Sequence, residues 1–400
     1  MNFIKSLYKG GMLFDGGFGA MLMALGVQSS DCSELMNLEA PDVVRRIHRS
    51  FIDAGSNAVE SNTFGANPMY LGKYGLSDRS AAITAAGVSL AKEAAGAGGF
   101  AVLSMGPSGG MLMPMGSLSA GEMLEGFYTQ AKAGIDAGAD AVIIETMGDI
   151  SEARLAAIAA IRARGEKDVP VIASFTFEGE RLMTGGAPDC AALILQAVGV
   201  DALGINCSGG PAELVSVLKK MRAAASLPII VQPNAGVPHM EKGRTVFPLS
   251  PEDMAKKMEV LVAAGAQAIG GCCGTTPEHI ALLRPLADEI GSFVPEGEDI
   301  KAAVTQRKIF PMSDIRGEFQ TIPATVDDLY DADPDAAAVR IDISGLGREQ
   351  TEELMLEAQQ VLKAPLCLDS DDPRMLEFAL SIYGGVALTH GKSSYGAVSI

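Results

Sequence analysis

Basic side chains, histidines and long apolar runs are all scarce in this sequence. Its 400 residues carry 31 basic and 49 acidic side chains, which gives a formal net charge of −18. Such an acidic chain argues against nucleic acids and anionic membrane surfaces as partners, because both are bound through basic patches. No apolar run approaches the ~20 residues that span a bilayer. We therefore expect neither a nucleic-acid-binding protein nor a membrane protein.

An export signal and a regular cysteine framework are also missing. Residues 1–5 lack the pattern of a secretory signal. The six cysteines do not follow the spacing of a disulfide scaffold, which is typical of proteins in a reducing compartment. These absences predict a cytoplasmic location and free thiols.

What the sequence does contain is a regular alternation of short apolar strands and amphipathic helices over residues 1–290. Eight such units are typical of a closed (β/α)8 barrel, the TIM barrel. An open doubly wound sheet is the rival fold, but the chain shows neither a phosphate loop nor a dinucleotide fingerprint. The predicted strands are 12–14, 58–61, 100–104, 141–144, 169–175, 202–205, 228–231 and 266–269.

The last part of the chain has a different organisation. We predict a linker over residues 291–335 and a small α/β unit over residues 336–400. The unit is too short for a second barrel.

Two adjacent cysteines, Cys272 and Cys273, lie where the eighth predicted strand ends and a helix begins. Cys207 has the same setting at the end of the sixth strand. In a barrel the carboxyl ends of all strands meet at one mouth, so these three thiols are expected to converge. Zn²⁺ binds thiolates tetrahedrally, and three protein ligands leave one position open, as in catalytic zinc sites.

A zinc ion with three thiolate ligands favours a particular chemistry. Sulfur ligands make it a poor activator of water, whereas a fourth thiol would be deprotonated on binding. A His-rich site would suit water activation better. The chain has only four histidines, and we interpret His279, the one near a mouth cysteine, as a surface or supporting residue. Two alternatives remain, namely buried structural cysteines and a redox protein with a disulfide between Cys272 and Cys273.

Other polar residues at the same predicted mouth could bind the charged groups of an amino-acid thiol. Asp15 and Glu145 could bind an ammonium group, and the backbone N–H groups around Gly16, Gly17 and Thr63 could bind a carboxylate. Glu60 could instead hold Thr63 or a backbone amide. Each carboxylate could also be a simple cap or turn residue.

Six segments of the sequence resemble the homocysteine S-methyltransferase family, in order, over about residues 8–290. The likeness is closest to the homocysteine-binding module of cobalamin-dependent methionine synthase. The segment Gly271-Cys272-Cys273-Gly274 is the most specific; the others begin at Asp15, Glu60, Gly106, Gly204 and Pro233.

This resemblance implies that Cys207, Cys272 and Cys273 bind zinc and that the homocysteine sulfur joins them. It also implies that Asn234 fills the fourth position in the substrate-free state only. Asp15, Thr63 and Glu145 look like the amino-acid clamp, with Glu60, Gly16 and Gly17 beside them.

Members of this family differ in methyl donor. Some use S-methylmethionine or betaine directly, and the methionine synthase type uses methylcobalamin held on another module. The Met-rich segment 106–116 looks like the methionine synthase type, yet the chain lacks the Asp-x-His-x-x-Gly cobalamin signature. The resemblance therefore implies a corrinoid on a separate protein, with the methyl group derived from methyltetrahydrofolate. A subunit of a corrinoid complex acting on another thiol is the alternative.

Residues 366–370 weakly resemble the start of a folate-binding barrel, which makes the last unit a candidate remnant of one.

Overall fold

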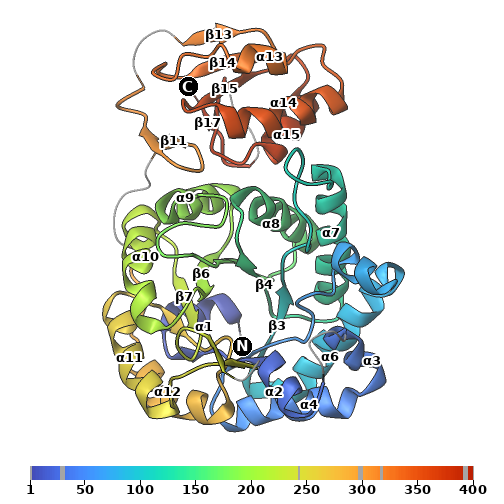
Figure 1. The fold of residues 1–400 in the computed structure, drawn as a ribbon, viewed down its shortest axis with the longest axis vertical. Coiled ribbons are helices and arrows are strands. Elements are labelled where there is room, and N and C mark those ends of the chain that lie inside the picture. Colours follow the sequence, from blue (N-terminus) through green and yellow to red (C-terminus); the bar gives the residue numbers. More distant parts are fainter. Residues whose placement is uncertain are drawn as a thin grey trace.

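A computed structural model of the chain describes residues 2–27, 32–241, 244–295, 301–315, 319–390 and 395–399. Its larger part is a ring of eight parallel strands surrounded by helices (Figure 1). The first and second strands sit at the two ends of the strand order, and a parallel bridge between Phe14 and Ala58 joins them. The predicted (β/α)8 barrel is thereby confirmed.

The barrel strands and the main outer helices alternate along the chain as predicted. The strands are β1 (Met12–Leu13), β2 (Ala58–Glu60), β3 (Phe100–Met105), β4 (Ala141–Met147), β5 (Val171–Phe175), β6 (Ala202–Cys207), β7 (Ile229–Pro233) and β10 (Ala268–Ile269). The helices are α4 (Pro41–Asp53), α6 (Ser80–Ala95), α7 (Ala120–Asp136), α8 (Ile150–Arg164), α9 (Pro188–Val198), α10 (Pro211–Ala224), α11 (Pro251–Ala263) and α12 (Pro277–Asp288).

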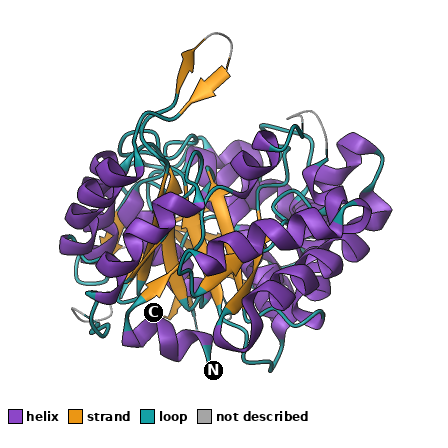
Figure 2. Cartoon of the chain, turned by 90° about the horizontal axis from the view of Figure 1, so that it is seen from below, coloured by secondary structure: helices purple, strands orange, loops and turns teal. Residues whose placement is uncertain are grey.

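Two insertions decorate the end of the barrel where the strands finish. Helix α2 (Phe18–Ala24) follows β1, and a hairpin of β8 (His239–Glu241) and β9 (Arg244–Val246) follows β7. Figure 2 shows this hairpin standing clear of the loops at that end. The shorter helices α3 (Met36–Glu39) and α5 (Pro68–Leu71) complete the loops after β1 and β2.

The opposite end of the barrel is closed by apolar side chains. Helix α1 (Phe3–Lys9) places Phe3 edge-on against Phe14 and Phe100, with ring centroids 6.3 and 5.3 Å away. These three rings belong to a buried apolar cluster that also contains at least one residue from each of the eight barrel strands. Among the described residues, this end of the barrel interior is therefore closed by side chains, and the strands finish at the other end, which carries α2 and the hairpin.

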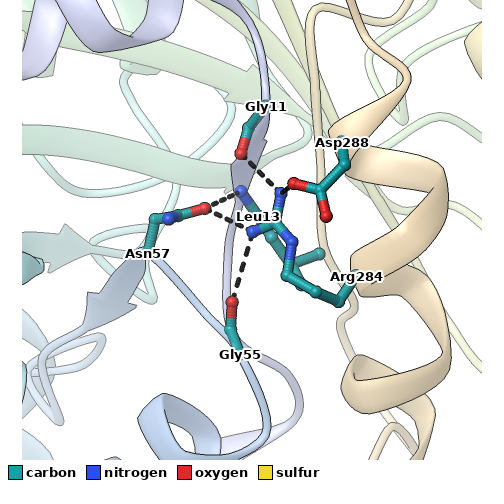
Figure 3. A network of polar contacts seen from close by, with 6 residues as sticks. All are labelled: Gly11, Leu13, Gly55, Asn57, Arg284 and Asp288. Carbon is teal, nitrogen blue, oxygen red and sulfur yellow. Dashed lines mark hydrogen bonds and ion pairs between the residues drawn. The ribbon is translucent and has the colours of Figure 1, made fainter.

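A polar network fixes the seam between the first and last barrel units (Figure 3). Arg284 on α12 donates to the carbonyl oxygens of Gly11 and Gly55, at 2.7 and 3.2 Å, and to Asn57 Oδ1 at 2.6 Å. Asn57 Oδ1 also accepts the backbone N–H of Leu13. One side chain thus ties β1, the turn before β2 and α12 together.

Replacement of Arg284 by alanine is expected to lower the free energy of unfolding by ~2–4 kcal/mol, because it leaves several partly buried acceptors without their hydrogen-bond donor. Urea denaturation would measure it. Arg49→Ala is the control, since Arg49 forms an exposed ion pair with Asp53 on the same helix and its loss should cost less than ~1 kcal/mol. Equal losses in both variants would show that the seam network contributes little.

The C-terminal unit is a parallel sheet with helices on it, placed beside α8 and α9 in Figure 1. A hairpin of β11 (Ala302–Val304) and β12 (Ile309–Pro311) precedes it. The sheet strands are β13 (Gln320–Ile322), β14 (Val339–Asp342), β15 (Leu366–Asp369), β16 (Leu388–Thr389) and β17 (Val398–Ser399), and the helices are α13 (Val326–Leu329), α14 (Arg348–Val361) and α15 (Pro373–Ile382).

The sheet begins earlier than residue 336, because β13 pairs with β14 from inside the segment predicted as a linker. Three residues are too few to show an alternating pattern, so this edge strand was not predicted.

The unit is anchored to the barrel by Arg154 of α8, which is 2% exposed and donates to the carbonyl oxygens of Ser381 and Tyr395. None of the helices in the described ranges combines the length and hydropathy of a membrane-spanning segment.

Candidate metal and substrate site

Three sulfur atoms meet at the open end of the barrel. Cys207 ends β6, and Cys272 and Cys273 follow β10. Cys207 Sγ lies 2.9 Å from Cys272 Sγ and 3.9 Å from Cys273 Sγ, and all three sulfurs lie within 4.8 Å of one another. All three cysteines are free thiols. Three soft donors in one group fit the ligand preference of zinc.

An unusual backbone path brings these sulfurs together. Cys207 and Ser208 both have positive φ angles, 54° and 57°, and Gly209 continues the turn at 103°. Non-glycine residues adopt this region rarely, and such strain concentrates at functional sites. On the other segment, the backbone N–H of Cys272 donates to Pro233 O, and that of Cys273 donates to Asn234 Oδ1. Strand β7 therefore supports the cysteine pair from between β6 and β10.

The three thiols share negative charge unequally. Contacts with Cys207 and Cys272 lower the pKa of Cys273 to about 3. Contacts with Cys207 and Cys273 raise the pKa of Cys272. The contact with Cys272 lowers the pKa of Cys207, but the contact with Cys273 and burial outweigh it, so that the net pKa is raised. The cluster stabilises one thiolate, and ionising all three requires a compensating cation.

Three carboxyl groups, those of buried Asp15 and Glu145 and of half-buried Glu60, lie at the same end of the barrel. Asp15 Oδ2 accepts the backbone N–H of Glu60, and Gln232 donates to Glu60 Oε1 at 2.8 Å. Burial raises the pKa of Asp15, Glu60 and Glu145 alike, and the charge of Glu145 raises the first two further. Among the described residues, no donor reaches the buried Oδ1 of Asp15. An ammonium group would supply this oxygen with a hydrogen-bond donor and the three carboxyl groups with a positive charge.

Asn206 connects the carboxyl groups to the sulfurs. Its Oδ1 accepts the backbone N–H of Thr146 and the Ser174 hydroxyl, both at 2.8 Å. Its Nδ2 faces Glu145 Oε2 at 3.3 Å and Cys272 Sγ at 3.9 Å. The residue before Cys207 thus holds the end of β4 against the sulfur cluster.

Comparison with known proteins agrees with this geometry. The sequence profile of the family described as homocysteine S-methyltransferase matches residues 12–286.

The chain belongs to the homocysteine S-methyltransferase family.

Curated relatives of this homocysteine S-methyltransferase family member include methionine synthases of two mycobacteria. The Mycobacterium tuberculosis protein is 36% identical over 286 residues, which cover 67% of this chain and 24% of the relative. The Mycobacterium leprae protein is 33% identical over 313 residues, covering 74% and 26%. The chain therefore spans about a quarter of the length of these relatives.

A solved structure of similar fold is the homocysteine methyltransferase MmuM of Escherichia coli in its metallated form. The TM-score is 0.58 at 26% identity, covering 69% of this chain and 96% of that chain. The oxidised form of the same enzyme gives 0.56 at 25% identity. The family membership predicted from the sequence motifs is confirmed.

Not every predicted clamp residue in this homocysteine S-methyltransferase family member has free hydrogen-bonding groups. The Thr63 hydroxyl donates to Ser104 O and its backbone N–H donates to Ser61 O, so both already have protein acceptors. The Gly17 backbone N–H donates to the carbonyl oxygen and hydroxyl of Thr275. A substrate carboxylate that accepts from the Thr63 or the Gly17 N–H would have to share that N–H with its present protein acceptor. Their roles, and that of Gly16, stay predictions.

Asn234 and His279 occupy supporting positions. Asn234 is 6% exposed, and its Oδ1 already accepts the Cys273 N–H, which leaves one lone pair for a metal in the substrate-free state. His279 caps the start of α12 through Thr276, and its Nε2 lies 3.1 Å from Leu249 O. His279 is therefore engaged away from the sulfurs, in keeping with a supporting residue.

Glu145 gives a testable pH dependence of stability. Burial raises its pKa to about 7, so the neutral form is favoured in the folded state. The contribution of this raised pKa to the stability of the folded state is fully present below the pKa that Glu145 has in the unfolded chain. It is lost as the pH rises towards 7. In the metal-free reduced protein, Glu145→Gln should therefore increase the free energy of unfolding at pH 8 by up to ~3 kcal/mol, with little change at pH 4.

Urea denaturation across this pH range would measure the effect. Glu122→Gln is the control of opposite sign, because the backbone N–H and hydroxyl of Ser119 lower the pKa of exposed Glu122. A Glu145→Gln variant that follows the wild-type pH profile would show that this carboxyl group is not held neutral.

Proposed function

We propose that this protein is a zinc-dependent homocysteine S-methyltransferase that forms methionine. The observation that carries the proposal is the convergence of Cys207, Cys272 and Cys273 in a barrel of this family, together with an Asp15 oxygen that no donor among the described residues reaches. A reducing compartment such as the cytoplasm suits three free thiols.

Zinc held by these three thiolates would offer one open position to a substrate thiol and lower its pKa. The chain's own residues then orient the rest of the substrate. Asp15 and Glu145 receive the ammonium group, which also relieves the repulsion between their buried carboxyl groups. Asn206 keeps Glu145 and Cys272 at a fixed spacing, and Gln232 holds Glu60. The backbone around Gly16, Gly17 and Thr63 is the proposed carboxylate side.

Two sources of the methyl group are supported by different observations. The relatives of this chain that are named methionine synthase are about four times as long as the matched part, which supports a donor carried elsewhere, namely methylcobalamin on a separate corrinoid protein. The likeness to MmuM covers 96% of that enzyme, which supports a self-sufficient barrel that uses a small donor such as S-methylmethionine or betaine. We favour the first, because the identity is higher.

A donor-swap assay tests the proposal. Zinc-loaded, reduced protein would be incubated with homocysteine and one donor at a time: methylcobalamin, S-methylmethionine or betaine. We expect methionine with methylcobalamin. Methionine from S-methylmethionine or betaine alone would favour the self-sufficient barrel. No methionine from any donor, together with transfer to another small thiol, would favour a subunit that acts on a different substrate.

A further inference from the structure

A cavity of about 260 Å³ lies between the barrel and the C-terminal unit. The barrel contributes the start of α7 and the side chains of Leu155 and Arg162 on α8, and the C-terminal unit contributes residues of α14 and α15. Figure 1 shows α15 on the side of the unit that is next to α7 and α8. None of the described residues that line the cavity belongs to the sulfur group or to the carboxyl groups at the open end of the barrel. The cavity is therefore distinct from the candidate metal and substrate site.

Positive charge is concentrated around this cavity. Three arginines line it, namely Arg162 in the last turn of α8, Arg348 at the start of α14 and Arg374 at the start of α15. Among the described lining residues the only carboxylate is that of Glu377. The chain as a whole has a formal net charge of −18, so a cavity with an excess of arginine departs from the composition around it. Such a local excess attracts anions.

Two of these arginines are held by aromatic rings. The guanidinium carbon of Arg348 lies 4.4 Å from the centre of the Phe378 ring. Arg162 donates from Nε to the Tyr395 hydroxyl at 3.0 Å, and its guanidinium carbon lies 5.3 Å from the centre of that ring. Within the described ranges, neither of these two arginines forms an ion pair with a carboxylate, whereas exposed Arg374 pairs with Asp372 at 3.2 Å. Arg162 and Arg348 therefore keep their charge available to a ligand.

The shape and lining of the cavity indicate the class of ligand. Leu155 and Ile382, which are 1% and 2% exposed, form an apolar wall. Guanidinium groups beside such a wall interact more strongly with an anion than they would in open water. Arginine binds phosphate and carboxylate oxygens in pairs. The volume is slightly below the ~300–1,000 Å³ of sites for drug-sized ligands, so a compact ligand with several charges fits best.

We propose that this cavity binds a compact organic polyanion, such as a bisphosphate or a tricarboxylate. The anion contacts Arg162 from the barrel and Arg348 from the C-terminal unit, and it relieves the repulsion between these like charges. Because it joins the two units, its binding also stabilises the folded chain. The site is independent of methyl transfer, so the proposal holds whatever thiol the barrel methylates.

Isothermal titration calorimetry of zinc-loaded, reduced protein at low ionic strength would measure the binding of two probes, 2,3-bisphosphoglycerate and tricarballylate. The site variant is Arg162→Gln with Arg348→Gln. The matched control is Arg46→Gln with Arg49→Gln, which changes the net charge equally at two exposed positions of α4. We expect the affinity to fall by at least ~10-fold in the site variant and by less than ~2-fold in the control. Glu377→Gln should raise the affinity by ~2- to 5-fold, because it removes a like charge from the cavity.

Thermal unfolding adds a second readout. Each bound probe should raise the unfolding temperature of the wild-type chain and of the control, and should leave that of the site variant unchanged. Binding of one probe alone would support the site and assign its ligand to the phosphate or to the carboxylate class.

Two results would overturn the proposal. The first is a wild-type chain that binds neither probe with a Kd below ~1 mM. The second is an equal loss of affinity in the site and control variants, which would show a diffuse attraction to the surface. Should the site variant fail to fold, Glu377→Gln still decides, because unchanged or weaker binding by that variant would contradict an anion held beside this carboxylate.

Discussion

Replacement of Cys272 by alanine is expected to abolish both zinc retention and methionine formation. Cys272 lies 2.9 Å from Cys207 and accounts for one of only three sulfur donors in the group. Zinc held by protein thiolates has apparent binding free energies of ~10–16 kcal/mol, so the loss of one ligand should weaken affinity by at least ~100-fold. Competition with a chromogenic chelator would measure it. Cys207→Ala and Cys273→Ala should behave alike, because the three act as one group.

Cys190→Ala is the matched control for this series. Cys190 is 1% exposed on α9 and belongs to the apolar core, so its loss removes a buried thiol without touching the sulfur group. Its zinc affinity should stay within ~2-fold of wild type, since no ligand is lost. Normal zinc affinity in Cys272→Ala would contradict a three-thiolate site and leave Cys272 as a structural residue.

Replacement of Asp15 by asparagine is expected to weaken homocysteine specifically through its amino group. A hydrogen bond to a charged group contributes ~1.5–3 kcal/mol, so the KM for homocysteine should rise by ~10- to 100-fold. The desamino analogue 4-mercaptobutyrate has no ammonium group, and its KM should not change. Initial rates with the two thiols would separate recognition of the amino group from a general loss of activity.

Asp140→Asn is the control for that substitution. Asp140 also accepts a backbone N–H, from Ala101, but it stands at the start of β4, at the closed end of the barrel. Its replacement should leave both KM values unchanged. A rise in KM of equal size for both thiols in Asp15→Asn would show that Asp15 shapes the site without binding the ammonium group.

The barrel could be predicted from the sequence because parallel strands buried on both faces read as short apolar runs with clear ends. The ends of helices α8 (Ile150–Arg164), α9 (Pro188–Val198) and α15 (Pro373–Ile382) coincide with residues that commonly begin or end helices. Asp149 caps the first of these, proline opens the other two, and Gly165 or Gly199 follows the first two. The β8–β9 hairpin was missed because His239, Met240 and Glu241 are all exposed and show no alternation.

The cysteines of the candidate site were recognisable because a Cys-Cys pair at a strand end is rare and chemically specific. Asn206 and Gln232 were visible only as polar residues at strand ends. Their partners, Glu145 and Glu60, are 61 and 172 residues away in sequence, so side-chain packing across the barrel decides their contacts. The same reason explains why Thr63 looked available in the sequence, although Ser104 and Ser61 already accept its hydrogen bonds.

X-ray absorption at the zinc edge, with L-selenohomocysteine added to zinc-loaded reduced protein, tests the central claim most directly. The sulfur group predicts three sulfur neighbours at ~2.3 Å before addition and one new selenium neighbour afterwards. A fit that needs two or more imidazole nitrogens, or a spectrum unchanged by the selenol, would contradict a site in which Cys207, Cys272 and Cys273 hold the metal for an incoming thiol.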